Sequence, residues 1–359
     1  MKAKRRIVVK VGSNVLTRAD GKANVTNMSA LVDQIAALRH KGHEVILVSS
    51  GAVACGRGVV KSSRKLDEAS QRQVFSSVGQ IKLINTYSSL FGDYGIIIGQ
   101  VLTQKDNFAS RNAYLNQRSC MDAMLRCGVL PIVNENDTAS MTELMFTDND
   151  ELSGTIAAMM DADTLIILSN IDGIYTGAPD DPESQLIARV KPGEDLSRYI
   201  RSSRSGLGRG GMVTKYGIAR MLSEEGVRVV IANGTRPGIL ADLIERPGET
   251  PHTEFEPSTE AVSSVKRWIA HSGSFAKGSL HVNARAAEAL RGPEAVSLLP
   301  IGLTHIAGEW TEGDIVKLFD PDGELIGIGR ADMDSATTES LIGKHGARPV
   351  VHYDYLIRE

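Results

Sequence analysis

The chain has 359 residues, of which 42% are hydrophobic and 23% are charged, and its formal net charge at pH 7 is -3. This length predicts two domains, and the composition and charge are typical of a soluble globular protein whose main partner is neither nucleic acid nor a membrane. The three cysteines form no CxxC pair and an odd number cannot pair completely, which favours a reduced setting and argues against a zinc site.

The first residues, MKAKRR, and the apolar run that follows superficially resemble a secretory signal. Lys10 interrupts this run directly after residues 7–9, far short of the apolar core that a signal peptide needs. No stretch of the sequence approaches the roughly 18 apolar residues of a membrane span. We therefore expect a cytoplasmic protein without a membrane segment.

Short apolar runs alternate with helical patterns over the first two-thirds of the chain. The predicted strands are residues 7–11, 45–48, 96–98, 129–133, 164–168 and 227–231. The predicted helices include residues 28–41, 118–126, 152–160 and 214–224. Continuous apolar strands separated by helices predict an α/β domain over residues 1–256, with a three-layer, mostly parallel sheet covered by helices on both faces. Ligands of such sheets bind at the carboxyl ends of the strands.

The character of the sequence changes after the polar, proline-containing stretch at 247–257, and we expect a connector at 257–274. Short strands with glycine-containing turns follow it, at residues 279–282, 296–299, 315–319, 325–330 and 349–352. The sequence DPDG within this part is a typical hairpin turn. These features predict a small, mostly β domain over residues 275–359.

Two strand ends combine small residues with the pattern of an anion site. Lys10 ends an apolar strand and precedes the turn GSN, so that an ammonium group and backbone N–H groups can face one phosphate. A lysine that extends from a strand end into solvent would have the same sequence. The turn SSGAV at 49–53 also follows a strand and precedes a helix whose positive end favours an anion, although an ordinary strand-to-helix turn would look the same.

Two segments rich in acids and amides suit an amino acid ligand. The segment NEND at 134–137 follows a strand, and its polar groups can hold the ammonium and the carboxylate of an amino acid; a solvated loop is the alternative. The segment TDND at 147–150 opens a helix, where capping explains one Asp or Asn but not three in a row. Clustered carboxylates repel one another unless cations offset them, which Lys10 and a second lysine could do.

The glycine-rich segment SGLGRGGMVTK at 205–215 is the fifth candidate. Residues 206–211 match the dinucleotide pattern GxGxxG, which would indicate an NAD-dependent oxidoreductase, but the polar and basic residues before them do not form a strand pattern. The sequence contains no GxxxxGK[ST] phosphate loop. What remains is a flexible loop before a helix, which could fold over a polyphosphate while Lys215 reaches the transferred group.

In this order, the segments resemble the amino acid kinase family, and within it the members that phosphorylate glutamate. The resemblance is carried by VVKVGSNVLT, VSSGAVACGR, PIVNENDTA, DNDELS, DGIYT and SGLGRGGMVTK. The glycine pattern through residues 298–302, 313–314 and 327–329 is similar to a PUA domain, which most other members of the family lack. The resemblance therefore covers nearly the whole chain.

The resemblance implies a role for individual residues. Lys10 and Lys215 would contact the phosphates and stabilise charge on the transferred group, while Asp150 holds both lysines. Glutamate would be bound by Ser50, Asp137 and Asn149, with Asn134 nearby. The nucleotide would be contacted by Lys10, Ser169, Asn170, Arg209, Gly210, Gly211, Met212, Val213, Thr214 and Lys215. The family usually has Thr-Asp where this chain has Ser169 and Asn170, so the nucleotide contact there is expected to differ.

The resemblance also implies the ligands. ATP and Mg²⁺, the latter carried mainly by the nucleotide phosphates, are the expected cofactors, with no separate metal site. Proline is the expected feedback inhibitor, and a homo-oligomer is the expected assembly. Because the γ-carboxylate of glutamate is already ionised at pH 7, no general base is needed, and the main obstacle is the repulsion between two anions. Two lysines, Mg²⁺ and helix N-termini would offset that repulsion.

Two alternatives remain besides the oxidoreductase. Another amino acid kinase, acting on aspartate, acetylglutamate or carbamate, would share the sheet and the lysines. An RNA-binding protein is the other alternative, because PUA domains often bind RNA. Residues 275–359 contain eight basic and thirteen acidic residues, a net charge of -5, whereas binding to a phosphate backbone needs a basic face. We therefore do not expect RNA binding as the main activity.

Overall fold

The structure is a computed structural model, and it describes residues 4–60, 66–109, 111–138, 148–200, 211–260, 264–292 and 294–358. The chain forms two compact units. The first contains Met1–Gln104 and Cys120–Ala261, and the second contains Lys105–Ser119 and Val262–Glu359. None of the described helices is long and apolar enough to cross a membrane. The domain boundaries expected from the sequence remain a prediction.

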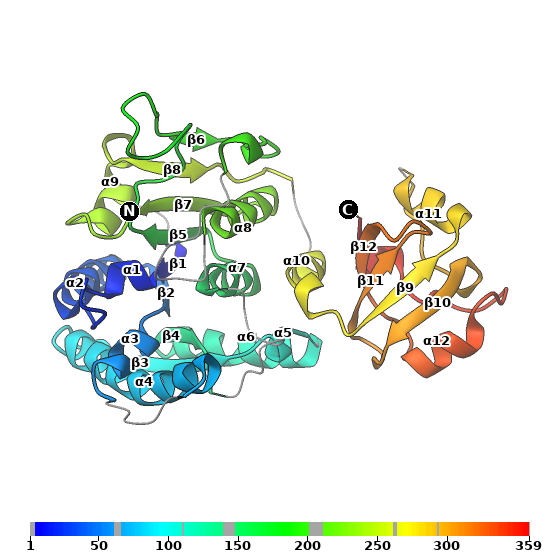
Figure 1. Ribbon diagram of the computed structural model, residues 1–359, viewed down its shortest axis with the longest axis horizontal. Helices are drawn as coiled ribbons and strands as arrows, with labels where there is room; N and C mark the ends of the chain where they lie inside the picture. Colours follow the sequence, from blue (N-terminus) through cyan, green and yellow to red (C-terminus); the bar gives the residue numbers. More distant parts are fainter. Residues whose placement is uncertain are drawn as a thin grey trace. The chain divides into compact units, whose positions relative to one another are not determined.

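The first unit is built on an eight-stranded sheet, in the order β3-β4-β2-β1-β5-β7-β8-β6 (Figure 1). Its strands are β1 (Arg6–Val11), β2 (Glu44–Ser49), β3 (Ile98–Thr103), β4 (Leu130–Glu135), β5 (Thr164–Ser169), β6 (Arg189–Val190), β7 (Arg228–Asn233) and β8 (His252–Phe255). Every neighbouring pair is parallel except β7 and β8, which are antiparallel. β1 lies at the centre between β2 and β5, where its apolar side chains are buried from both faces.

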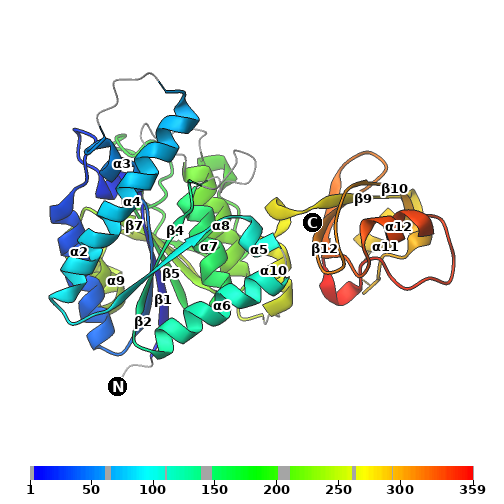
Figure 2. The same cartoon turned by 90° about the horizontal axis from the view of Figure 1, so that it is seen from below.

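Helices cover both faces of this sheet, as Figure 2 shows. The helices of the first unit are α1 (Ser13–Leu16), α2 (Val25–His40), α3 (Ala52–Arg57), α4 (Glu68–Gly92), α7 (Asn149–Met159), α8 (Met212–Glu224) and α9 (Ile239–Glu245). One face carries α2, α3, α4 and α9, and the other carries α7 and α8 (Figure 2). The expected three-layer, mostly parallel sheet is therefore confirmed. α6 (Arg111–Arg126) has its first half in the second unit and its last turns in the first.

Two glycines let α3 pack directly against the backbone of α4. A Cβ atom on Gly56 would lie 1.8 Å from the carbonyl oxygen of Phe75, and one on Gly79 would lie 1.7 Å from that of Ala52. Real Cβ atoms do not approach so closely, so only glycine fits at either position without a shift of the helices. This contact holds α4 beside the turn that follows β2.

The second unit contains a five-stranded sheet in the order β10-β9-β11-β12-β13 (Figure 1). Its elements are α5 (Asp106–Ala109), α10 (Ser264–His271), β9 (Gly278–Val282), α11 (Ala284–Arg291), β10 (Leu303–Gly308), β11 (Ile315–Phe319), β12 (Leu325–Arg330), α12 (Ser335–Leu341) and β13 (Leu356–Arg358). A small, mostly β domain is thus confirmed. Residues 105–119, from the middle of the chain, pack with it: Trp268 Nε1 donates to the backbone oxygen of Phe108 at 3.0 Å.

Several predicted element bounds were wrong. The segments 296–299 and 349–352 are not strands and meet only in an isolated bridge between Leu298 and Val351, whereas β10 and β13 were missed. β3 begins at Ile98, where the prediction ended, because it is a half-exposed edge strand without a continuous apolar run. The NEND segment does not simply follow a strand, since Asn134 and Glu135 are the last residues of β4.

Candidate active site

The predicted site residues are delivered by neighbouring strands at one edge of the sheet. Lys10 lies in β1, Ser50 directly follows β2, Asn134 lies near the end of β4, and Ser169 ends β5. These four strands are adjacent and parallel, so their carboxyl ends meet at the same edge. The sheet order therefore gathers residues that are up to 159 positions apart in the sequence.

Two lysines share one buried aspartate at this edge. Lys10 Nζ lies 2.5 Å from Asp150 Oδ1, and Lys215 Nζ lies 2.9 Å from Asp150 Oδ2. Lys10 is 5% exposed, Lys215 is 7% exposed and Asp150 is fully buried at 0%, so the charges are held away from water. The structure thus brings together the three residues expected to act on the phosphoryl group, and their role in the reaction remains a prediction.

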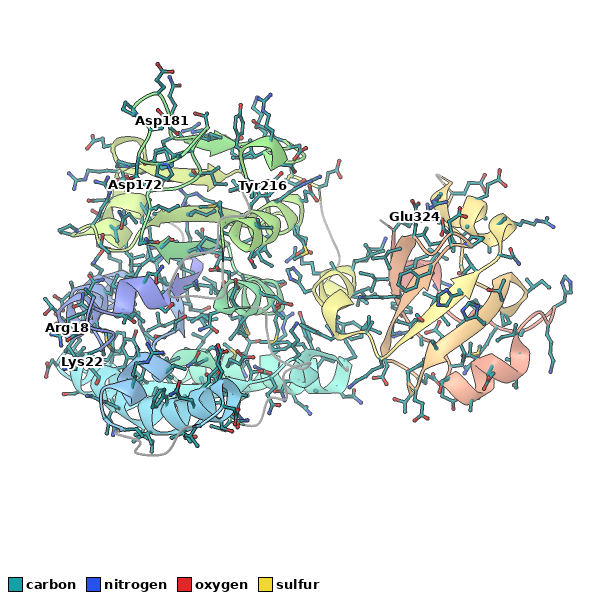
Figure 3. All side chains as sticks on the ribbon, in the orientation of Figure 1. Arg18, Lys22, Asp172, Asp181, Tyr216 and Glu324 are labelled. Carbon is teal, nitrogen blue, oxygen red and sulfur yellow. The ribbon has the colours of Figure 1, made fainter. Side chains whose placement is uncertain are left out.

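The helices that carry Asp150 and Lys215 are fixed by local contacts. Asp148 caps α7, because its Oδ1 accepts from the backbone N–H groups of Asp150 and Glu151 at 2.7 and 3.0 Å. In α8, the hydroxyl of Tyr216 (labelled in Figure 3) accepts from the backbone N–H of Leu196 at 2.9 Å. Asp150 and Lys215 lie in the first turns of these two helices, where their side chains meet at 2.9 Å.

The electrostatics of the two aspartates differ. Burial tends to raise the pKa of Asp150, but the positive charges of Lys10 and Lys215 outweigh this effect and lower it below its usual value. The pKa of Asp148 is raised, first by burial and then by the neighbouring charge of Asp150. Asp148 Oδ2 is buried and has no hydrogen-bond partner in the described part of the chain, which agrees with an environment that disfavours its charged form. Asp150 is therefore the carboxylate that stays ionised beside the lysines.

Hydrogen bonds join three of the four residues expected to bind glutamate. Asn149 Nδ2 donates to Ser50 Oγ at 2.8 Å and to Asn134 Oδ1 at 3.1 Å, which joins three of them. Asp137, the fourth, is 6% exposed and lies at the end of the same β4 segment. Because Asn149 precedes Asp150 in α7, the amide group is directly adjacent to the lysine cluster along the chain.

Three residues of α4 that the sequence did not indicate also reach this site. Arg72 donates to Asp137 Oδ1 through Nε at 2.9 Å and Nη2 at 2.6 Å, and Ser76 Oγ donates to Asp137 Oδ2 at 2.8 Å. Gln80 Oε1 accepts from Asn134 Nδ2 at 2.9 Å. Their partners lie 54 to 65 residues away in sequence, so no local motif could reveal them. Their only signal is the four-residue spacing of polar groups on an otherwise apolar helix face.

An open pocket of about 490 Å³ lies along α4 and β3. Its lining includes Ser76, Gln80, Glu135 and Asp137 on the polar side and Ile81 on the apolar side. None of Lys10, Asp150 and Lys215 lines it. Of the residues expected to bind glutamate, the pocket is lined by Asp137, and its lining includes none of Ser50, Asn134 and Asn149.

The nucleotide side of the site is partly described. Ser169 Oγ lies 3.4 Å from Asn170 Oδ1 at the end of β5. The N-cap of α8 is Gly211, which has no side chain to cap the helix. The first turn is formed by Met212, Val213, Thr214 and Lys215. Arg209, Gly210 and Thr147 lie outside the described residues, as does the rest of the glycine segment at 205–208.

The residues present fit a polyphosphate. The buried ammonium group of Lys10 lies beside Gly12, where a Cβ would come within 3.6 Å of Lys10 Nζ, so the backbone there passes close to the charge. The uncapped N-terminus of α8 offers further N–H donors next to Lys215. Among the described residues, no group of three or more His, Cys, Asp or Glu side chains could hold a metal ion. The expectation that Mg²⁺ is carried by the nucleotide stays a prediction.

In this parallel sheet, the central strand β1 carries Lys10, which pairs with Asp150 in the acidic first turn of α7. This arrangement defines a class of phosphotransferase. Residues 5–233 match the model of the amino acid kinase family, and residues 278–353 match that of the PUA domain. A carbamate kinase from Giardia lamblia bound to AMP-PNP shares the fold, with a TM-score of 0.52 at 14% identity over 72% of this chain and 100% of that chain. The chain belongs to the amino acid kinase family.

The curated relatives narrow the group within this family. A glutamate 5-kinase from Bacteroides thetaiotaomicron is 59% identical over 99% of this chain and 98% of its own length. A glutamate 5-kinase from Chlorobaculum tepidum is 46% identical over 98% and 97% of the two chains. Another from Trichlorobacter lovleyi is 37% identical over 98% and 96%. The chain therefore groups with the glutamate 5-kinases along nearly its whole length.

Proposed function

We propose that the protein transfers the γ-phosphoryl group of ATP to the γ-carboxylate of L-glutamate. The product is L-glutamyl 5-phosphate, and the reaction is the first step of proline biosynthesis. The observation that carries the proposal is the pair of buried lysines, Lys10 and Lys215, held on the two oxygens of Asp150, next along the chain to Asn149 and its hydrogen bond to Ser50. The named glutamate 5-kinase relatives support the choice of substrate.

The two lysines reduce the main obstacle to the reaction, which is the electrostatic repulsion between the two anionic substrates. Both ammonium groups lie on one carboxylate, so they stay close together before any substrate binds. Charges fixed in this way stabilise a developing anionic transition state without reorganisation during the reaction. Because the pKa of Asp150 is lowered, this carboxylate remains ionised and continues to hold both lysines at neutral pH.

The chemistry needs no activated side-chain nucleophile. An oxygen of the ionised γ-carboxylate forms the new bond to the γ-phosphorus, and the bond between that phosphorus and the bridging oxygen of ADP breaks. Lys10 and Lys215 hold the oxygens of the transferred group. When it is bound on the nucleotide, Mg²⁺ supplies further neutralisation of the phosphate charge.

The residues proposed to bind glutamate support recognition of a free amino acid. Asp137 and the amide oxygen of Asn149 would accept from the α-ammonium group, and the hydroxyl of Ser50, which accepts from Asn149, would donate to a carboxylate of the substrate. Asn149 immediately precedes Asp150, so a substrate held by its amide lies close to the lysines. Ser169 and Asn170, at the end of β5, would lie beside the nucleotide.

A hydroxamate assay tests the substrate assignment. The acyl phosphate product reacts with hydroxylamine, so ATP-dependent hydroxamate formation can be compared for glutamate, aspartate and acetylglutamate with the same purified protein. We expect glutamate to be used far better than the other two acids. A preference for aspartate or acetylglutamate would instead assign the chain to another branch of the family.

The further ligands remain part of the proposal. Proline would inhibit by binding at or over the glutamate site, and a proline titration of the hydroxamate assay that leaves the rate unchanged would remove this element. A homo-oligomer is supported by exposed apolar side chains on α4 and the edge strand β3, with Ile81 64% and Leu102 41% exposed. Light scattering coupled to size-exclusion chromatography measures the assembly.

A further inference from the structure

One face of α4 carries polar side chains at helical spacing that form hydrogen bonds with residues expected to bind glutamate. Arg72, Ser76 and Gln80 follow one another at intervals of four residues, so they lie on the same side of the helix. Ser76 is 3% and Gln80 is 9% exposed. Buried polar groups are unfavourable unless they are hydrogen-bonded, and all three side chains form hydrogen bonds with residues expected to bind glutamate. Arg72 Nη2 also lies 3.8 Å from Glu135 Oε2.

The Asp137 carboxylate is held at both of its oxygens. Arg72 supplies two N–H donors to Oδ1, and Ser76 supplies one O–H donor to Oδ2. An ionised carboxylate has about four acceptor sites, so these donors leave about one for a ligand. The remaining site has a fixed direction, because rotation of the carboxylate would break charge-assisted bonds from Arg72. Asp137 is therefore oriented before a substrate ammonium arrives.

Gln80 fixes the orientation of two amide groups of the site. Its Oε1 accepts from Asn134 Nδ2, which turns Asn134 Oδ1 toward Asn149. Asn149 Nδ2 then uses its two N–H donors on Asn134 and Ser50. The atom of the Asn149 amide that faces a ligand is consequently its oxygen, an acceptor. Without Gln80, the two asparagines would lose the contact that selects this orientation.

The helix that carries these residues cannot move away easily. Gly79 lies between Ser76 and Gln80, and its α-carbon packs on the backbone of Ala52, only two residues after Ser50. The reciprocal contact of Gly56 with Phe75 lies one turn earlier in α4. The α4 face and the turn after β2 are therefore parts of one tightly packed unit, which gives the hydrogen bonds a rigid base.

We propose that Arg72, Ser76 and Gln80 are positioning residues that orient Asp137 and the asparagine amides for the amino acid substrate. This inference rests on the proposed function and assigns the determinants of glutamate affinity to a helix distant in sequence from the substrate-contacting segments. These side chains act on the binding of the amino acid and not on the phosphoryl group, because their hydrogen bonds among the described residues lead to Asp137 and Asn134 and not to Lys10 or Lys215.

The kinetics of α4 variants test the inference. For Arg72→Ala we expect the glutamate KM to rise about 10-fold or more, and for Ser76→Ala roughly 3- to 5-fold, as is typical for the loss of a charged and of a neutral hydrogen bond. The ATP KM and kcat should change by less than about twofold. Arg72→Lys should recover part of the affinity, and added methylguanidinium should partly rescue Arg72→Ala. Lys82→Ala, at an exposed basic position of the same helix, is the control.

Gln80→Leu tests the amide side of the pocket. This change keeps the side-chain volume but removes the acceptor for Asn134, so we expect the glutamate KM to rise roughly 5-fold, with kcat nearly unchanged. Gln73→Leu is the matched control, because Gln73 is exposed on the same helix. An equal effect of both glutamine variants would contradict the role assigned to Gln80.

A double-mutant cycle separates positioning from direct contact with the substrate. If Arg72 acts through Asp137, Arg72→Ala should add little to the glutamate KM of Asp137→Ala. Effects that multiply fully would show that Arg72 acts independently and would overturn the inference. If Arg72→Ala does not fold, the same cycle with Ser76→Ala decides.

The outcomes distinguish this inference from the proposed function. A wild-type protein that forms no glutamyl hydroxamate defeats the proposed function itself. A wild-type protein that is active, with a glutamate KM unchanged within twofold in Arg72→Ala and Gln80→Leu, keeps the function and overturns the role of α4.

Discussion

Lys10 illustrates how a single residue departs from the pattern of its element. Every other residue of β1 after Arg6 is an apolar side chain buried in the sheet, whereas Lys10 brings an ammonium group into that environment. Such a group is costly to bury unless it is paired, and Asp150 supplies the pair at 2.5 Å. A second lysine on the same carboxylate leaves positive charge available for an anion. Asp148 would reduce that excess when it is ionised, but burial and the neighbouring charge of Asp150 raise its pKa, although Lys10 and Lys215 act to lower it.

The raised pKa of Asp148 predicts the effect of Asp148→Asn. Asparagine keeps the capping oxygen of α7 but carries no charge. A raised folded pKa means that the ionised form costs stability, a cost that appears as pH rises through the folded pKa and is absent below the unfolded value of about 3.9. We therefore expect Asp148→Asn to raise the melting temperature at pH 7 and this gain to vanish near pH 4.

Asp67→Asn is the matched control for this measurement. Asp67 caps α4 in the same unit, but its pKa is lowered, chiefly by a hydrogen bond from the Ser70 side chain. Its replacement should give no gain at pH 7, because the ionised form is favoured in the folded protein. Thermal unfolding of both variants between pH 4 and pH 8 makes the comparison, and an equal shift in both would contradict the electrostatic explanation.

At the scale of elements, the contact between α3 and α4 positions one wall of the site. Glycine is unfavourable inside a helix, yet Gly56 and Gly79 occur where the two backbones meet. The gain is a close approach that larger residues would prevent. The elements that surround the substrate pocket are therefore fixed by backbone packing as well as by side-chain hydrogen bonds.

Gly79→Ala tests this packing. Alanine normally favours a helix by about 1 kcal/mol over glycine, but here its Cβ would lie 1.7 Å from the Ala52 carbonyl oxygen. We expect a net loss of about 1–3 kcal/mol in the free energy of unfolding, as for other overpacked sites. Gly92→Ala, where a Cβ meets nothing within 4 Å, should be neutral or slightly stabilising. Denaturant unfolding that shows the same stability for both variants would contradict the packing argument.

The sequence predicted those elements whose signal is local. The alternation of apolar runs with helices is sufficient to predict the α/β sheet. Lys10 is conspicuous because it places a charge near the end of an apolar strand. β10 and β13 were missed because β10 is mostly exposed and β13 has only three residues. Arg72 could not be found, since its partner Asp137 is 65 residues away and only the folded sheet brings them together.

At the scale of the whole molecule, the chain is divided in a way that the sequence did not indicate. The second unit recruits residues 105–119 from within the first two-thirds of the chain. Trp268 is fully buried there, with its ring 6.2 Å from that of Tyr114 and its Nε1 bonded to Phe108. The predicted domain 1–256 includes this segment, because contacts between Trp268 and a segment about 160 residues earlier leave no local signal in the sequence.

Trp268→Ala tests the independence of the two units. Loss of a large buried aromatic side chain should lower the free energy of unfolding of the second unit by about 3–5 kcal/mol. Trp268 is not part of the site, so the glutamate KM and kcat should stay within about twofold of wild type. Calorimetry and steady-state kinetics on the full chain measure both quantities. An unchanged melting profile would show that residues 105–119 do not depend on this tryptophan.

The turnover of lysine variants tests the central claim most directly. We expect Lys10→Met and Lys215→Met each to lower kcat for glutamyl hydroxamate formation by roughly a hundredfold or more, because each removes a fixed charge from the transferred phosphoryl group. Lys22→Met, at an exposed position labelled in Figure 3, should leave kcat unchanged. Near-normal turnover in either buried-lysine variant would contradict the account.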